Sequence, residues 1–320
     1  MHKEKPILSV AMATYNGELF LEEQIQSILN QSFQNFELII CDDCSTDKTA
    51  QIIQKYMQTH SNIKLFKNET NIGFIKNFEK LISLCETPYI ALSDQDDIWL
   101  ENKLEIQMKA MKKAESLNNN SPLMVHSDLM MINEEGKHLQ NSFFKYKKYK
   151  LKDAKDLGQI LGPCGVMGNT ILFNQALKDK ILPFPSCLEV HDYWIAVMTE
   201  LLGERITMRQ PLVKYRIHNE NASNTIVKYA SKTYSIQKSI NFFRKKSPLP
   251  YLSSHRSDVI EYILENYTLE KNDMALLKVF HRYLQKSSLT LSLLLKMFKY
   301  DFIKRDGWYR LKFLFLYLYQ

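Results

Sequence analysis

Apolar residues in the first hundred positions alternate between two spacings. Short apolar runs of strand length stand at 7–14, 36–42, 63–67 and 88–93. Stretches with helical spacing lie between them, at 18–31, 45–58 and 73–85. The second of these helices is expected to begin at Ser45 or Thr46, which are good N-cap residues. This alternation indicates βαβ units, and therefore an α/β fold with a mainly parallel, Rossmann-like sheet flanked by helices.

The pattern is weaker in the rest of the chain. Residues 123–132 and 168–174 are expected to form strands, and residues 191–203 a buried helix. A last strand is expected within 210–224, where it runs into a polar loop, and helical spacing dominates from about residue 226. The sequence therefore predicts one domain over 1–225 and a mainly helical extension over 226–320.

Polar clusters follow the four early strands. They read "TYNG" at 14–17, "CDDCSTD" at 41–47, "NETNIG" at 68–73 and "SDQDD" at 93–97. Ligands of parallel sheets bind outside the carboxyl ends of the strands, so these clusters predict one site at that edge. The first corner lacks the G-x-G-x-x-G pattern, which makes a dinucleotide site a poor interpretation.

Three carboxylates, Asp94, Asp96 and Asp97, end the fourth strand. Side chains alternate along a strand, so Asp94 and Asp96 point to the same side if the extended conformation continues. Two such carboxylates repel each other unless a cation lies beside them. Mg²⁺ or Mn²⁺ takes oxygen ligands and is often shared with substrate phosphates. The triplet favours a divalent metal site over a solvated capping loop.

Composition excludes several other classes. With 320 residues and 45% hydrophobic content, the chain can form a large core, and its N-terminus has no signal-peptide order. A cytoplasmic location is therefore expected. Five cysteines are an odd number, and we expect them to be reduced. Cys41 and Cys44 form a C-x-x-C, but no second pair follows to complete a zinc site.

The segments "VAMATYNGELF", "FELIICDDCSTDKTAQII" and "LSDQDDIW" together resemble the nucleotide-sugar glycosyltransferases of family 2, which share the GT-A fold. The resemblance covers roughly residues 6–222. Within the family, "HSDLMMINEEG", "HDYWIAV" and "YRIHNENASN" are most similar to bacterial rhamnosyltransferase-like enzymes of surface polysaccharide synthesis. The resemblance implies transfer of a sugar from a nucleoside diphosphate, dTDP-rhamnose or a UDP-hexose, to a polysaccharide or lipid-linked oligosaccharide.

The resemblance also implies roles for individual residues. The residues expected to bind the nucleotide-sugar donor are Thr14, Tyr15, Asn16, Asp43, Asn71, Gly73, Lys76, Asp94 and Arg216. Asp43 would hydrogen-bond the base, and Lys76 would face phosphate or simply be solvated. Cys44 stands where the family often has Gly, which makes that turn less permissive.

Metal and acceptor roles are implied in the same way. Asp96, Asp94 and His218 are expected at the metal, with Asp96 as the most direct ligand. Asp192 matches the family's catalytic base, at a helix N-terminus whose dipole favours the ionised form. Family 2 enzymes invert the anomeric centre in one displacement, so no covalent nucleophile is needed. Trp99 and Trp194 would either wall the acceptor site or pack in the core.

The C-terminal part is strongly basic. From Ile226 to the end there are 17 Lys and Arg against 7 Asp and Glu, a net +10, whereas the residues before it carry 25 and 28, a net −3. The last residues mix these cations with Leu, Phe, Tyr and Trp, which is typical of a helix in a membrane interface. We expect peripheral attachment to the inner leaflet, where a lipid-linked acceptor would be found. A helix packed on the protein, or at a homodimer contact, is the alternative.

Two other functions fit parts of the sequence. A catalytically silent carbohydrate- or nucleotide-binding scaffold would also use the polar corners, although it would not need both the paired carboxylates and Asp192. A nucleic-acid-binding protein is suggested only by the basic tail, and no nucleic-acid motif accompanies it.

Overall fold

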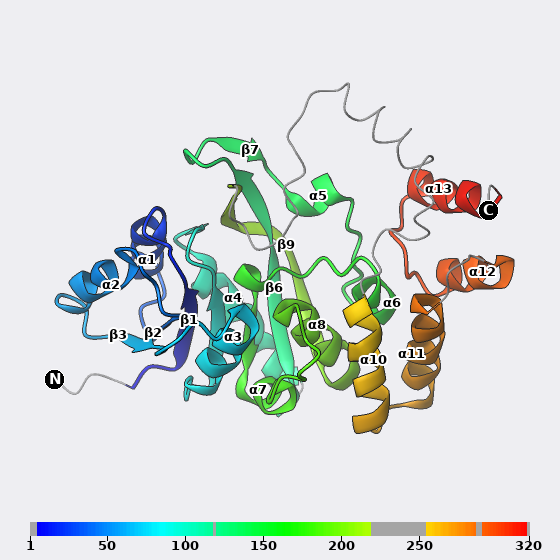
Figure 1. Cartoon of the computed structure of the whole chain (residues 1–320), viewed down its shortest axis with the longest axis horizontal. Coiled ribbons are helices and arrows are strands. Elements are labelled where there is room, and N and C mark those ends of the chain that lie inside the picture. The colour runs from blue at the N-terminus through cyan, green and yellow to red at the C-terminus, as the bar shows by residue number, and fades with distance from the viewer. Residues whose placement is uncertain (1–4, 118–119, 219–253, 286–289, 319–320) are drawn as a thin grey trace.

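The computed structural model describes residues 5–117, 120–218, 254–285 and 290–318 (Figure 1). Nine strands of this part form one sheet. They are β1 Leu8–Thr14, β2 Phe36–Asp42, β3 Ile63–Lys67, β4 Tyr89–Ser93, β5 Ile98–Trp99, β6 Leu123–Ile132, β7 His138–Gln140, β8 Leu172–Asn174 and β9 Glu204–Arg216. The order across the sheet is β3–β2–β1–β4–β8–β6–β9–β5, and β7 pairs with β6 at the side.

The sheet is mainly parallel, as the sequence predicted, and it also includes antiparallel strands. Strands β3, β2, β1 and β4 are parallel, and so are β6 and β9. The short strand β8 runs antiparallel to both β4 and β6, and β5 runs antiparallel to β9. The strand expected over 168–174 is shorter than predicted, because Gly168–Thr170 forms a 3₁₀ turn before β8 begins. The first four strands therefore end together at one edge, as predicted.

Helices cover both faces of this sheet. Those of the first 218 residues are α1 Leu21–Leu29, α2 Thr49–Met57, α3 Phe74–Ser83, α4 Lys103–Leu117, α5 Phe143–Lys147, α6 Leu157–Leu161, α7 Gln175–Ile181 and α8 His191–Leu202. Side-chain alternation along β1 divides the core in two. Val10 and Met12 pack with α1 and α4, whereas Ala11 faces the core formed with α3, α7 and α8.

Helix α2 begins later than the expected Ser45 or Thr46. The Ser45 hydroxyl donates to Asp42 Oδ1 at 2.5 Å, and the Thr46 amide donates to Asn16 Oδ1 at 2.9 Å. The Lys48 amide likewise donates to a Glu18 carboxylate oxygen at 2.9 Å. These contacts fix residues 45–48 as a loop that joins the first two corners, and the helix starts at Thr49.

The C-terminal helices pack against the α6 and α8 side of the domain, at the right of Figure 1. They are α10 Ser254–Asn266, α11 Lys271–Leu284, α12 Leu291–Lys299 and α13 Gly307–Leu318. Ile260 and Phe280 belong to the same buried cluster as Trp194. Arg305 binds the buried Asp156 through two nitrogens, at 2.6 and 2.5 Å. The domain boundary predicted at 225–226 lies outside the described residues.

The close contact between α6 and the segment after α12 can be tested at two glycines. A Cβ at Gly158 would lie 1.7 Å from the Tyr300 carbonyl oxygen, and one at Gly162 would lie 2.0 Å from that of Phe302. Such overlap with backbone typically costs about 1–3 kcal/mol. We expect Gly158→Ala and Gly162→Ala to lower the free energy of unfolding by that amount in urea denaturation. Gly307→Ala is the control, because nothing lies within 4 Å of its added Cβ. Equal stability of all three variants would contradict this packing.

Candidate active site

A cavity of about 440 Å³ opens where β1, β2 and β4 end. Its walls come from the three strand ends, from the start of α3 and from the loop before α8. The lining includes Thr14, Tyr15, Asp43, Asn71, Phe74, Phe78, Asp94, Gln95, Asp96, Gly168, Asn169, His191 and Asp192. The structure therefore brings together half of the fourteen residues that the sequence assigned to the site, namely Thr14, Tyr15, Asp43, Asn71, Asp94, Asp96 and Asp192.

Asp43 organises the loop after β3. Its Oδ1 accepts hydrogen bonds from the Asn68 side chain and the Ile72 amide, both at 2.8 Å, and its Oδ2 accepts from the Gly73 amide at 2.9 Å. Gly73 has φ +87°, a conformation that favours glycine. Asp43 Oδ2 keeps room for one more donor, which fits the predicted contact with a base N–H.

The neighbouring predicted residues are placed differently. Asn71 lines the cavity, and its Oδ1 accepts from the Gly73 amide at 3.0 Å. Lys76 is exposed on α3 and does not line the cavity, which agrees with the solvated alternative. Asn16 has φ +47° and holds the loop at Thr46, so its contacts are structural.

The first and fourth corners are tied by a residue that the sequence analysis did not select. The Tyr15 amide donates to Gln95 Oε1 at 2.8 Å, and Gln95 Nε2 donates back to the Tyr15 carbonyl at 3.0 Å. A Cβ at Gly17 would lie 2.4 Å from Gln95 Oε1, so a larger residue there would displace the Gln95 side chain. Gln95, which stands between Asp94 and Asp96, thus holds the first and fourth corners together.

The three carboxylates have three different environments. Asp94 points into the cavity, where burial and the charges of Asp96 and Asp192 raise its pKa to about 8. Asp96 also lines the cavity, and its Oδ2 lies 2.8 Å from Nε2 of His218. Asp97 is fully buried and turns away from the cavity.

Asp97 is a structural residue. Its Oδ2 accepts from Asn169 Nδ2 at 2.5 Å, and its Oδ1 accepts from the Arg216 amide at 3.0 Å. Burial raises its pKa well above the usual value, as do the charges of Asp96 and Asp94. The buried Lys103, whose pKa burial lowers to about 7, supplies a nearby positive charge. Asp97 therefore connects the end of β4 to the loop before β8 and to β9.

Arg216 does not take the predicted place at the donor. Its side chain is buried behind the carboxylates, where Nε donates to the Asp96 carbonyl at 3.0 Å and a terminal nitrogen to the Glu134 carbonyl at 2.7 Å. The other terminal nitrogen pairs with Glu23, and the guanidinium lies 4.7 Å from the Phe20 ring centre. These contacts use the guanidinium to fix the loop that carries Asp96.

Asp192 lines the same cavity as Asp94 and lies in the first turn of α8. Its Oδ2 accepts from the Gly168 amide at 3.2 Å. Burial raises the pKa of Asp192 to about 6, although the amides of Tyr193 and Gly168 act in the opposite direction. The helix dipole was expected to favour the ionised form, and burial outweighs that effect. Above pH 6 the carboxylate is available as a base.

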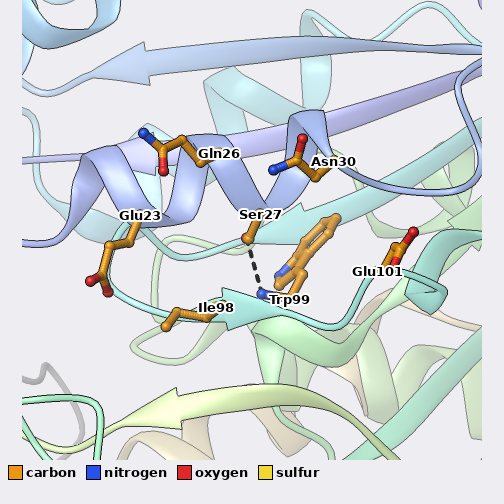
Figure 2. A pocket seen from close by; sticks show the side chains of 7 residues that line it. All are labelled: Glu23, Gln26, Ser27, Asn30, Ile98, Trp99 and Glu101. Carbon is orange, nitrogen blue, oxygen red and sulfur yellow. Dashed lines mark hydrogen bonds between the residues drawn. The ribbon is translucent and has the colours of Figure 1, made fainter.

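Neither predicted tryptophan offers a face to a sugar. Trp194 is completely buried, and its indole N–H donates to the Ile181 carbonyl at 2.9 Å. Trp99 is 3% exposed, and the Lys103 ammonium lies 3.6 Å from its ring centre. In Figure 2 the Trp99 amide donates to Ser27, beside an open depression between α1 and β5. The core alternative therefore describes Trp194; Trp99 is also almost completely buried, although it lines that depression.

Some residues of the cavity were missed from the sequence. His191, Phe74, Phe78 and Asn169 all line it, although none was selected. Only the "HD" at the start of the predicted helix could have pointed to His191. The other three lie in stretches that read as ordinary helix or strand.

Within the described part, no group of three or more His, Cys, Asp or Glu side chains is arranged to hold a metal ion. Asp96 and His218 form a mixed oxygen and nitrogen pair, and Asp94 adds a carboxylate whose ionisation its neighbours oppose. Such a set fits a divalent cation that takes its other ligands from phosphates and water.

The described helices also include none long and apolar enough to cross a bilayer.

Comparison with known proteins agrees with this arrangement. The model of the family described as Glycosyl transferase family 2 matches residues 9–172. An uncharacterized glycosyltransferase of Methanocaldococcus jannaschii, MJ1057, is 33% identical over 224 residues, which are 68% of this chain and 73% of that protein. The Escherichia coli protein named UDP-Glc:alpha-D-GlcNAc-diphosphoundecaprenol beta-1,3-glucosyltransferase WfgD is 27% identical over 236 residues, 72% of this chain and 85% of its own.

Solved structures share the fold. Residues 1–349 of S. aureus TarS, in complex with UDP-GlcNAc, give a TM-score of 0.59 at 18% identity, covering 97% of this chain and 89% of TarS 1–349. The mannosyltransferase PcManGT from Pyrobaculum calidifontis, in complex with GDP-Man and Mn²⁺, gives a TM-score of 0.54 at 14% identity. The match covers 93% of this chain and 74% of PcManGT. The predicted GT-A fold is therefore confirmed.

The different environments of Asp94 and Asp97 predict opposite effects on stability. Asp97→Ala leaves buried donors unpaired, at about 1–3 kcal/mol for each, so its melting temperature should fall. Asp94→Ala removes repulsion at the cavity wall, so its melting temperature should rise. Because the folded-state pKa of Asp94 is raised to about 8, the protein loses stability from this group as pH rises from about 4 to 8.

The gain in melting temperature that Asp94→Ala produces is therefore expected to be largest near pH 8 and to vanish near pH 4. Thermal melts in EDTA at several pH values would measure both variants against the wild type. A fall in both variants, or a gain in Asp94→Ala that does not depend on pH, would show that the assigned environments are wrong.

Proposed function

Because the chain belongs to glycosyltransferase family 2, we propose that it moves one sugar from a nucleoside-diphosphate donor to a polysaccharide precursor by an inverting, metal-dependent displacement. The observation that carries this proposal is the single cavity that Asp94, Asp96 and Asp192 line together with Asp43. Carboxylates that share one cavity can serve opposite ends of the same displacement. A silent scaffold would need no such arrangement.

We propose that the donor lies along the strand-end corners. Thr14, Tyr15, Asp43 and Asn71 line the part of the cavity that would hold the base and ribose. The free capacity of Asp43 Oδ2 suits the N–H of a pyrimidine. The diphosphate would then lie at Asp94 and Asp96, and the sugar between them and Asp192.

The displacement follows from these positions. An acceptor hydroxyl attacks the anomeric carbon while the bond to the diphosphate oxygen breaks, and the electron pair leaves with the diphosphate. Asp192 accepts the hydroxyl proton as the new bond forms. Mg²⁺ or Mn²⁺, held by Asp96 with Asp94 and His218 near it, would offset the charge of the leaving diphosphate as a Lewis acid. Attack from the face opposite the leaving group inverts the anomeric centre.

We propose dTDP-rhamnose or a UDP-hexose as the donor. A pyrimidine nucleotide agrees with the names of two similar proteins, WfgD with UDP-Glc and TarS with UDP-GlcNAc. The rhamnosyl option rests on the motifs "SDQDDIW" and "HDYWIAV". The acceptor would be a growing surface polysaccharide or a lipid-linked oligosaccharide.

Calorimetry with UDP, dTDP and GDP, with and without Mn²⁺, tests the donor and metal assignments. The wild type should bind UDP or dTDP more tightly with Mn²⁺, and Asp96→Ala should lose this increment. Asp192→Asn is the matched control: it should keep nucleotide binding while turnover falls by about 100-fold or more. Absence of binding to all three nucleotides would refute the transferase proposal for this site.

We further propose that the enzyme is cytoplasmic and attaches peripherally to the inner membrane leaflet. Five large apolar side chains are exposed on α12 and α13, namely Leu291, Leu295, Trp308, Leu311 and Leu314. Lys296 and Lys299 are exposed on α12 as well. Apolar side chains with adjacent cations match the interface of a bilayer that contains anionic lipids. A lipid-linked acceptor would be presented at the same surface.

Flotation with vesicles of phosphatidylcholine and phosphatidylglycerol tests this attachment. Leu295 and Trp308 are 58% and 62% exposed, so Glu at both positions should leave folding intact and lower vesicle binding. Loss of even one buried apolar side chain, about 1.5–3 kcal/mol, lowers binding by about tenfold or more. Leu117→Glu is the control, because Leu117 is 75% exposed on α4. Unchanged vesicle binding in the double variant would contradict the membrane assignment. So would a double variant that loses a homodimer but keeps its vesicle binding.

A further inference from the structure

The imidazole of His191 is buried without a hydrogen-bond partner. His191 is 3% exposed, and within the described part of the chain neither Nδ1 nor Nε2 contacts a donor or acceptor. A neutral imidazole always carries one donor and one acceptor nitrogen. Leaving such groups unpaired in a folded interior costs about 1–3 kcal/mol each. A residue kept in this state at a cavity wall is therefore placed for a ligand.

The ring is held in place by aromatic neighbours. Its plane stacks on Phe78, with ring centres 4.0 Å apart and an angle of 13° between planes. The ring of Phe74 contacts it edge-on, with ring centres 5.0 Å apart. Burial lowers the pKa of His191 to about 3, so the ring is neutral at physiological pH. It can neither turn towards solvent without leaving this stack nor become charged.

A second unpaired atom lines the same cavity. The Asn169 side chain donates from Nδ2 to Asp97, while its Oδ1 has no partner among the described residues. Gly168 connects the two residues, because a Cβ there would lie 2.9 Å from Nε2 of His191. Three of the six unpaired buried side-chain atoms found in the described part of the chain thus belong to this one wall.

The position of this wall favours the transferred sugar over the acceptor. His191 immediately precedes Asp192 and shares the cavity with Asp94. A group held between these carboxylates is the sugar that the reaction moves, since its anomeric carbon must lie between base and leaving group. His191 and Asn169 are almost completely buried, so only a ligand deep in the cavity reaches them.

We infer that His191, together with Asn169 Oδ1, binds ring hydroxyls of the transferred sugar and so determines which sugar the enzyme accepts. This inference rests on the proposed glycosyltransferase function and identifies a specificity-determining residue for it. A hydroxyl both donates and accepts, so it satisfies either nitrogen of the neutral ring. The aromatic stack fixes the ring, and the amide oxygen of Asn169 offers a second acceptor in the same cavity.

The test compares nucleotide and nucleotide-sugar binding in His191→Phe, which keeps an aromatic ring but has no nitrogen. Kd values would be measured in Mn²⁺ for UDP, dTDP, UDP-glucose, UDP-galactose, UDP-N-acetylglucosamine and dTDP-rhamnose. For the sugar that the wild type prefers, we expect Kd to rise about tenfold, which corresponds to one lost hydrogen bond of about 1.4 kcal/mol. Binding of the free nucleoside diphosphate should be unchanged.

A second variant covers the case in which phenylalanine does not fit beside Gly168. His191→Gln offers an amide donor and acceptor at the reach of Nε2, and it should recover part of the affinity for the nucleotide sugar. Without ligand, a fitting phenylalanine should raise the melting temperature by about 2–4 °C, because unpaired nitrogens are removed.

Three results would overturn the inference. Unchanged nucleotide-sugar affinity in both variants would show that the nitrogens bind no sugar. Equal loss of nucleotide and nucleotide-sugar binding in a folded variant would show that the ring only shapes the cavity. If the wild type binds none of the nucleotides, the proposed function itself fails, which is visible before any variant is compared.

Discussion

The buried carboxylate of Asp97 is the interaction on which the site depends. Three carboxylates within four residues would repel one another and unfold the end of β4 if all faced the same space. Asp97 turns inward to Asn169 and the Arg216 amide, which leaves Asp94 and Asp96 in the cavity. One residue of the triplet thus supplies the anchor that holds the other two at a shared wall.

The class of fold could be predicted because it depends on local periodicity. Alternation on β1 and helical spacing in α1 each bury one face, and any packing of these elements must respect that. The start of α2 could not be predicted, because Ser45 and Thr46 bind Asp42 and Asn16 from other segments. The antiparallel insertion of β8 also depends on its partners β4 and β6, and three residues carry too little pattern to reveal it.

The candidate site was predictable where residue type and strand-end position decide the role. Asp43, Asp94 and Asp192 reach the cavity for that reason. Large side chains at similar positions were not predictable. Arg216 was expected at the donor, and Trp194 either at the acceptor site or in the core. Each is covered by chain distant in sequence, Arg216 by Glu134 and Glu23 and Trp194 by the C-terminal helices. Whether a large residue is core or cavity wall is decided by tertiary packing.

Polar groups at the cavity wall differ from several buried ion pairs elsewhere in the protein. Away from the cavity, Arg205 pairs with Glu200 at 2.6 Å and Arg305 with Asp156 at 2.5 Å. At the cavity, Asp94 meets like charges, and His191 meets no hydrogen-bond partner within the described part of the chain. Each of these groups raises the free energy of the unliganded fold, and a cation or a sugar hydroxyl would lower it again. Under the proposed function, the stability lost here would be converted into affinity for a charged, hydroxyl-bearing ligand.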